Sequence, residues 1–131
     1  MKDITALLDE LDTSVAVVGA TDDPSKYGHV IYLDLKRKGF TVCPVNPNRP
    51  TVDGDPTYKQ LGDIPEKPTI VNLVVPPEVT AVILQECLEL DLMNVWLQPG
   101  AENPENMIFL QQHGFNYLAN ACIMVSSRLK A

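Results

Sequence analysis

The sequence predicts an α/β fold in which about five parallel strands form one sheet covered by helices on both faces. Five short, nearly all-apolar segments have the pattern of strands buried on both faces. Segments with helical spacing lie between them, which is the alternation expected of a parallel sheet. The chain has 131 residues, of which 45% are apolar. That length supports one hydrophobic core and not two, so residues 1–131 are predicted to form a single domain.

The first third of the chain predicts two helices and two strands. Apolar residues at helical spacing predict an amphipathic helix over residues 3–12. Residues 14–19 predict a buried strand, and residues 25–38 predict a helix that ends at Gly39. Residues 41–45 predict the second strand. Pro44 within it indicates an irregular or edge position, because proline cannot donate to the ladder.

The remaining elements follow the same alternation. Residues 46–57 read as a polar, proline-rich loop, followed by a short helical turn near residues 58–61. Asn103 is a candidate N-cap, with Pro104 at the first helical position of the last predicted helix. The other expected elements are a strand at 69–75, a helix at 79–91, a strand at 94–97, a helix from 104 to 113 and a strand at 115–118. No element is predicted beyond Ala119.

Right-handed crossovers between these elements predict a Rossmann-like, doubly wound sheet with strand order 3-2-1-4-5. Ligands bind such sheets beyond the carboxyl ends of the strands, where the strand order reverses. The predicted crevice lies between the first and fourth strands. The loops within its reach are 19–26, 46–49, 75–78 and 98–103.

Composition excludes several classes of function. The chain carries 10 basic and 17 acidic residues, a net charge of −7. This balance argues against nucleic-acid binding and against docking on an anionic membrane. No apolar run approaches the roughly 20 residues of a membrane span, and the N-terminus lacks a signal-peptide pattern. We therefore expect a cytoplasmic protein without membrane contacts.

The three cysteines indicate neither a disulfide framework nor a metal site. Cys43, Cys87 and Cys122 are widely spaced, odd in number and form no C-x-x-C pair. Three reduced thiols are expected. Cys122 follows the last predicted strand near the crevice, so it is the one candidate for a reactive thiol.

The loop after the first strand is a candidate phosphate site. Gly19 lets a phosphate approach the backbone, and the start of the next helix presents free N–H groups. Thr21 and Ser25 add hydroxyls, and Lys26 adds a positive charge. A tight turn followed by a helix N-cap explains the same residues equally well.

Familiar nucleotide and catalytic motifs are incomplete. The loop has no G-x-G-x-x-G, and the second strand ends in Val45-Asn46-Pro47-Asn48-Arg49 without an acid for a ribose diol. That segment suits a phosphorylated ribose or an adenine edge. Asp22-Asp23 resembles the acidic pair of a receiver domain, but the partner aspartate and lysine are missing. No G-x-S-x-G is present, so no catalytic residue is assigned.

Three segments, in order along the chain, resemble the small stand-alone CoA-binding proteins. The segments are Val17 to Pro24, Gly39 to Asn48 (Gly-Phe-Thr-Val leading to Pro-Val-Asn-Pro-Asn) and Val95 to Gly100. These proteins are similar to the N-terminal domain of the succinyl-CoA synthetase α subunit. The resemblance extends from about Ser14 to Cys122 and implies a Rossmann-like fold with CoA across the carboxyl edge of the sheet.

The resemblance also implies which residues contact CoA. Those assigned to the pyrophosphate are Gly19, Ala20, Thr21, Pro24 and Lys26. Those flanking the adenosine are Val45, Asn46 and Asn48, with Arg49 as the partner of its 3′-phosphate. Val75, Pro76 and Pro77 would line the adenine or pantetheine wall, and Gln98 and Gly100 stand in the loop after the fourth strand.

The functional prediction is a non-catalytic protein that binds CoA or acyl-CoA, because the phosphohistidine and nucleotide-binding parts of the synthetase have no counterpart in the matched segments. The alternative is an NAD- or NADP-binding redox sensor with the same fold. A third hypothesis is weak acyl or thiol exchange through Cys122. A homodimer or an acyl-CoA enzyme is the candidate protein partner.

Overall fold

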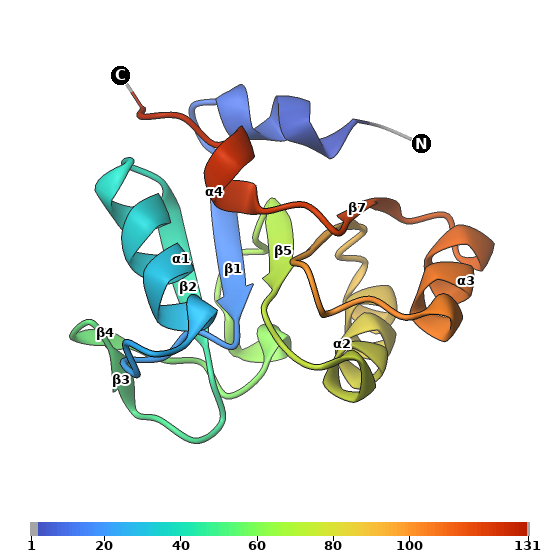
Figure 1. The fold of residues 1–131 in the computed structure, drawn as a ribbon, viewed down its shortest axis with the longest axis horizontal. Coiled ribbons are helices and arrows are strands. Elements are labelled where there is room, and N and C mark those ends of the chain that lie inside the picture. Colours follow the sequence, from blue (N-terminus) through green and yellow to red (C-terminus); the bar gives the residue numbers. More distant parts are fainter. Residues whose placement is uncertain (1–2, 131) are drawn as a thin grey trace.

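The computed structural model describes residues 3–130 and contains one parallel sheet between two layers of helix (Figure 1). Its strands are β1 (Ser14–Val18), β2 (Thr41–Val45), β3 (Thr51–Val52), β4 (Asp55–Pro56), β5 (Ile70–Leu73), β6 (Asn94–Leu97) and β7 (Asn116–Ala119). Its α-helices are α1 (Tyr27–Arg37), α2 (Pro77–Leu90), α3 (Pro104–Gln112) and α4 (Ile123–Ser126), and its 3₁₀ helices are η1 (Ile4–Asp9) and η2 (Leu61–Asp63).

The predicted α/β class, with its five parallel strands, is confirmed, and the predicted strand order is wrong. The observed order is β2-β1-β5-β6-β7, which is 2-1-3-4-5 in the numbering of the five predicted strands. β1 pairs with β2 on one side and with β5 on the other. The crevice at the reversal of strand order therefore lies between β1 and β5, not between the first and fourth strands.

Pro44 explains why the third strand cannot lie outside β2. The Tyr58 amide donates to the Pro44 carbonyl (2.9 Å) on the outer side of β2. In a parallel strand the N–H and C=O of one residue point to the same side, so the missing N–H of Pro44 also faces outward. A full strand could not complete its ladder there. The edge position indicated by Pro44 is confirmed, and among residues 3–130 a single bridge between Val45 and Tyr58 covers that edge.

Alternate residues of the strands build two cores, one on each face. Val15 and Val17 of β1 face a layer formed by η1, α1 and α4, while Ala16 and Val18 face α2 and α3. Trp96, fully buried on the first face, donates its indole N–H to the carbonyl of Ala121 (2.9 Å). That bond ties β6 to the segment that leads into α4.

Several local predictions need correction. The opening segment forms the short 3₁₀ helix η1 rather than an amphipathic helix over residues 3–12. The loop at 46–57 contains the hairpin β3–β4, and the helical turn lies at Leu61–Asp63 rather than 58–61. The unassigned tail forms α4, and the residues after it reach η1, where Lys130 Nζ donates to the carbonyls of Leu8 (2.7 Å) and, just past η1, Glu10 (2.5 Å). In these segments, tertiary contacts override a weak local pattern.

The helix ends follow the sequence closely. Asn103 caps α3 by accepting a hydrogen bond from the Asn106 amide (2.8 Å), and Pro104 occupies the first turn. Gly39 follows α1 with φ +95°, a conformation that favours glycine. No helix within residues 3–130 is long and apolar enough to cross a membrane.

Candidate functional site

Two adjoining cavities open at the carboxyl edge of the sheet, one on each side of the turn after β1. One, of about 650 Å³, is lined by Gly19, Ser25, Lys26, Tyr27, Gly28, Val74, Val75, Pro76, Pro77, Gln98, Pro99, Gly100, Ala101 and Cys122. The other, of about 800 Å³, is lined by Val18, Gly19, Thr21, Lys26, Val45, Asn46, Pro47, Asn48, Arg49, Lys59, Val74, Val75, Pro76, Val79 and Ile83. Below, the first is called the apolar cavity and the second the cationic cavity. The shared residues are Gly19, Lys26, Val74, Val75 and Pro76.

Two glycines bring the start of α1 onto the turn after β1. Gly19 has φ +96°, and a Cβ there would lie 2.3 Å from the carbonyl oxygen of Val74. A Cβ on Gly28 would lie 2.0 Å from the carbonyl oxygen of Gly19. Neither position can carry a side chain without moving backbone atoms. The close approach places the N-terminus of α1 at the boundary between the two cavities.

The loop between Gly19 and α1 is held by its own polar groups. The Asp23 amide donates to Thr21 Oγ1 (3.2 Å), and Asp23 Oδ1 accepts from the Ser25 amide (3.0 Å) and hydroxyl (2.7 Å). The Ser25 hydroxyl and then its amide lower the pKa of Asp23. His29 Nδ1 lies 3.2 Å from the Thr21 carbonyl, and since a carbonyl only accepts, Nδ1 is the donor. The acidic pair is thus part of the loop scaffold.

The N-terminus of α1 remains open to a ligand. Lys26 is the N-cap residue and makes no side-chain capping bond. Tyr27 and Gly28, in the first turn, line the apolar cavity. The first N–H groups of a helix have no acceptor within the helix and carry the positive end of its dipole. The arrangement suits an anion placed near Lys26.

The loop after β2 is attached to the first loop by Asn46. Its Nδ2 donates to the carbonyl of Ala20 (2.9 Å), and its Oδ1 accepts from the amide of Asn48 (2.8 Å). Both ends of the Asn46 amide are therefore engaged within the protein. Its observed role is to position the loop that carries Arg49 into the cationic cavity.

A polar network anchors the β3–β4 hairpin, which follows this loop, to α1. The buried Tyr32 hydroxyl donates to Asp55 (2.6 Å), and Lys36 Nζ donates to Asp55 (2.8 Å) and Asp53 (3.0 Å). Lys36 and then Tyr32 lower the pKa of Asp55, while burial and then Asp55 raise the pKa of Tyr32. The Asp53 amide completes the link by donating to Asp22 (2.8 Å).

The charge of the cationic cavity is opposite to that of the whole molecule. Lys26, Arg49 and Lys59 line it, and no aspartate or glutamate is among its lining residues in the described chain. The protein as a whole carries a net charge of −7. A local group of cations near a helix N-terminus suits a polyanionic ligand.

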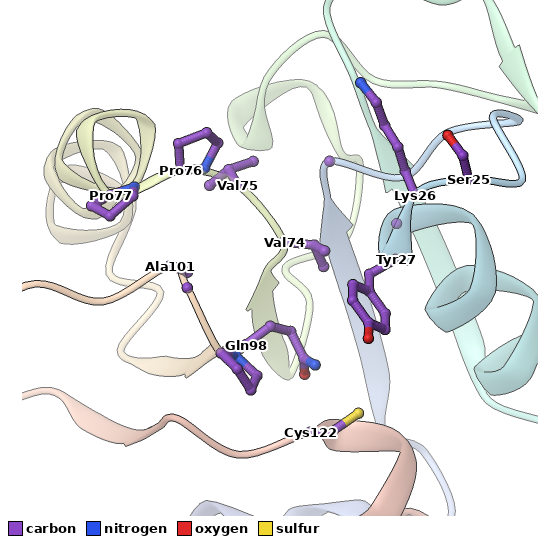
Figure 2. A pocket seen from close by; sticks show the side chains of 14 residues that line it. Ser25, Lys26, Tyr27, Val74, Val75, Pro76, Pro77, Gln98, Ala101 and Cys122 are labelled. Atoms are coloured by element: carbon purple, nitrogen blue, oxygen red, sulfur yellow. The ribbon is translucent and has the colours of Figure 1, made fainter.

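The opposite wall of the apolar cavity comes from the ends of β5 and β6. Figure 2 shows Val75, Pro76 and Pro77 at the upper part of this side and Gln98 below them, with Lys26 and Tyr27 across the cavity. Pro76 and Pro77 end the β5 segment and begin α2, so this wall has few backbone donors of its own. The surface is mostly apolar, and its buried polar side chain is Gln98.

The structure brings most of the predicted site residues together. Lining the cavities are Gly19, Thr21, Lys26, Val45, Asn46, Asn48, Arg49, Val75, Pro76, Pro77, Gln98 and Gly100. Ala20 is buried behind the turn, and Pro24 is exposed outside both linings. Contact of any of these residues with a ligand stays a prediction.

Gly28 and Lys59 are among the cavity residues that the sequence interpretation missed. Gly28 lacks the spacing of a familiar glycine motif, although its place nine residues after Gly19 in the first turn of a helix was a usable signal. Lys59 enters the cationic cavity because the loop after β2 folds back along the sheet edge at Tyr58. No local pattern in the sequence indicates that the chain folds back along the sheet edge at this point.

The cysteines differ in their surroundings, and all three are free. Cys87 is fully buried between α2 and the sheet, and burial raises its pKa to about 12. Cys43 is half-buried in β2, and burial raises its pKa as well. Cys122 lines the apolar cavity. Within residues 3–130, no three histidine, cysteine or acidic side chains form a group that could hold a metal ion.

Comparison with known proteins shows the family of the chain and the proteins that it resembles. The protein family described as CoA binding domain matches residues 13–128. The uncharacterized protein YneT of Bacillus subtilis is 30% identical over 112 residues, covering 86% of this chain and 83% of its own length. A conserved hypothetical protein from Pyrococcus furiosus has a similar structure, with TM-score 0.85 and 39% identity, covering 88% of this chain and 99% of that chain.

Longer relatives contain a similar segment within a larger enzyme. The alpha subunit of the ADP-forming acetate–CoA ligase II of Pyrococcus furiosus is 37% identical over 76 residues. The match covers 57% of this chain and 17% of that subunit. The similarity therefore concerns one part of the ligase.

Proposed function

This chain belongs to the CoA binding domain family, and from that premise we propose that it binds CoA or an acyl-CoA along the carboxyl edge of its sheet without itself catalysing a reaction. The observation that carries the proposal is the pair of adjoining cavities, one cationic and one apolar, which meet at Gly19 and Lys26. CoA has the same order of chemistry along its length: a phosphorylated adenosine, a pyrophosphate and a largely apolar pantetheine arm.

The proposed pose follows that order. The adenosine and its 3′-phosphate lie in the cationic cavity, within reach of Arg49 and Lys59. The pyrophosphate lies at the shared boundary, where Lys26 and the start of α1 offer a positive charge and free N–H groups. The pantetheine arm then extends into the apolar cavity between Pro76 and Gln98.

The non-catalytic part of the proposal rests on what the chain shares with its enzymatic relatives. The chain spans 17% of the acetate–CoA ligase subunit and 10–12% of the other ADP-forming CoA ligases it resembles. These matches span 73–78 residues each, so the ligase activity of the longer proteins is not carried over to this chain.

Calorimetric titration of ligand-stripped protein with CoA, 3′-dephospho-CoA, NAD and NADP at one salt concentration tests the proposal. We expect CoA to bind most tightly and 3′-dephospho-CoA to bind more weakly, because the 3′-phosphate loses its cationic partners. Tighter binding of NAD or NADP would mean that the site is as proposed but that its ligand is a nicotinamide dinucleotide. Absence of CoA binding would overturn the proposed function.

A further inference from the structure

Gln98 presents an unused hydrogen-bond donor to the apolar cavity. The residue follows β6 and is 5% exposed, and its side chain reaches toward the side of the cavity where Tyr27 and Cys122 lie (Figure 2). Its Oε1 accepts from the amide of Ile123 (2.9 Å), the first residue of α4. Its Nε2 has no hydrogen-bond acceptor among residues 3–130.

The bond to Ile123 determines which end of the amide is available. A backbone N–H can only donate, so the atom that faces it must be the oxygen of the Gln98 side chain. The NH₂ group must then point elsewhere, with two donors. The main-chain groups of Gln98 are also engaged, its N–H with the Leu73 carbonyl (3.1 Å) and its C=O with the Ala101 amide (2.9 Å). The residue is held rigidly and lacks only an acceptor for Nε2.

The Nε2 group faces the cavity, where a ligand carbonyl can accept its hydrogen bond. No residue among 3–130 accepts a bond from Nε2, and the neighbouring Val74, Pro77 and Pro99 present apolar side chains. The atom that completes this site is therefore a neutral acceptor carried by a molecule with an otherwise apolar end. A carboxylate is a poorer fit, since no cation other than Lys26 at the far boundary lines this cavity in the described chain.

Resting on the proposed function, we propose that the apolar cavity recognises an acyl-CoA thioester through its carbonyl oxygen, which accepts a hydrogen bond from Gln98 Nε2. The acyl group lies against Tyr27, Val74 and Cys122. The protein then distinguishes acyl-CoA from free CoA, because free CoA ends in a thiol and has no carbonyl at that position. The proposed function requires no such preference.

The test compares CoA, acetyl-CoA and S-ethyl-CoA by calorimetry. S-ethyl-CoA has the same carbon chain as acetyl-CoA and lacks only the carbonyl oxygen. We expect the wild type to bind acetyl-CoA about tenfold more tightly than S-ethyl-CoA, the size of one buried hydrogen bond. In Gln98→Glu the side-chain oxygen can still accept from Ile123 but cannot donate, so the preference should disappear. Gln112→Glu makes the same change at an exposed glutamine outside both cavities and should keep the preference.

The outcomes separate this inference from the proposed function. If CoA binds and the wild type shows no preference for acetyl-CoA over S-ethyl-CoA, the thioester inference is overturned and CoA binding stands. If Gln98→Glu weakens all three ligands equally, Gln98 meets the pantetheine arm instead, which also overturns the inference. If none of the three binds, the proposed function itself fails. The wild-type comparison decides the matter even if Gln98→Glu does not fold.

Discussion

The two cavities share one turn of backbone but are held in place by different forces. The apolar cavity is built from close backbone packing at Gly19 and Gly28 and from the buried Gln98. The cationic cavity depends on Arg49 and Lys59, which the loop between β2 and η2 carries. Asn46 and the polar network around Asp55 hold that loop.

This difference predicts different behaviour. Close-packed backbone has little freedom to adjust, so the shape of the apolar cavity should change little with pH or salt. Exposed charges on a loop are screened by salt and adapt to their ligand. We therefore expect shape selection at the apolar cavity and charge-dependent affinity at the cationic cavity. Four experiments can break or sharpen this contrast.

The largest effect is expected at the shared turn. In Gly28→Ala the new Cβ would meet the Gly19 carbonyl oxygen at 2.0 Å, so backbone must move. We expect unfolding to become easier by about 2–3 kcal/mol, despite the gain in helix propensity, together with loss of CoA binding. Thermal denaturation and calorimetry measure both. Gly62→Ala is the matched control, because its nearest contact would be an ordinary 3.9 Å from Leu90. If Gly28→Ala were as stable as the wild type, the backbone around Gly19 and Gly28 would not be as tightly packed as described.

Removal of one cation should weaken binding without affecting folding. We expect Arg49→Ala and Lys26→Ala each to reduce CoA binding by about 1–3 kcal/mol, with unchanged thermal stability. Lys67→Ala, at an exposed lysine outside both cavities, is the control. The loss in Arg49→Ala should be larger for CoA than for 3′-dephospho-CoA. Equal loss for the two ligands would contradict the assignment of Arg49 to the 3′-phosphate.

The hydrogen bonds from Tyr32 and Lys36 to Asp55, which hold the β3–β4 hairpin on α1, should make part of the folding stability depend on pH in the acid range. Because the folded-state pKa of Asp55 lies below its unfolded value of about 3.9, its contribution is present above that value and is lost as pH falls through the folded pKa. Tyr32→Phe removes one of the two bonds and should cost about 1 kcal/mol at neutral pH.

Urea unfolding between pH 3 and pH 7 measures this contribution. The stability of Asp55→Asn should fall less steeply below about pH 4 than that of the wild type. If the unfolding free energies of the two proteins changed in parallel with pH, the bonds to Asp55 would contribute nothing to this pH dependence.

The smallest effect is a local change in thiol reactivity. Cys122 lines the apolar cavity and Cys87 is buried with a raised pKa, so an alkylating reagent should label Cys122 first and leave Cys87 unmodified. Saturating CoA should slow labelling at Cys122 by severalfold and leave Cys43 unchanged, as mass spectrometry of peptides would show. Unchanged labelling of Cys122 would place the pantetheine arm outside this cavity.

The amino-acid pattern alone determined the α/β class, the five parallel strands and the N-cap at Asn103, because burial on two faces and local capping act within short segments. It also placed Lys26, Arg49 and Gln98 in loops at one sheet edge, since the carboxyl ends of parallel strands meet there. The proline at position 44 was evidence against the 3-2-1 order in the sequence. Its meaning became clear only in the structure, where the Pro44 carbonyl faces away from β1.

The tertiary structure decided what depends on contacts between distant segments. The strand order depends on which strand edge offers a complete set of hydrogen-bonding groups. The outer edge of β2 lacks the N–H of Pro44, and β5 pairs with β1 instead. The closeness of Gly28 to Gly19, the arrival of Lys59 in the cationic cavity and the orientation of Gln98 by Ile123 all join residues that no local pattern links. Side-chain direction and long-range pairing are set by packing of the whole chain, whereas periodicity records only whether each segment is buried.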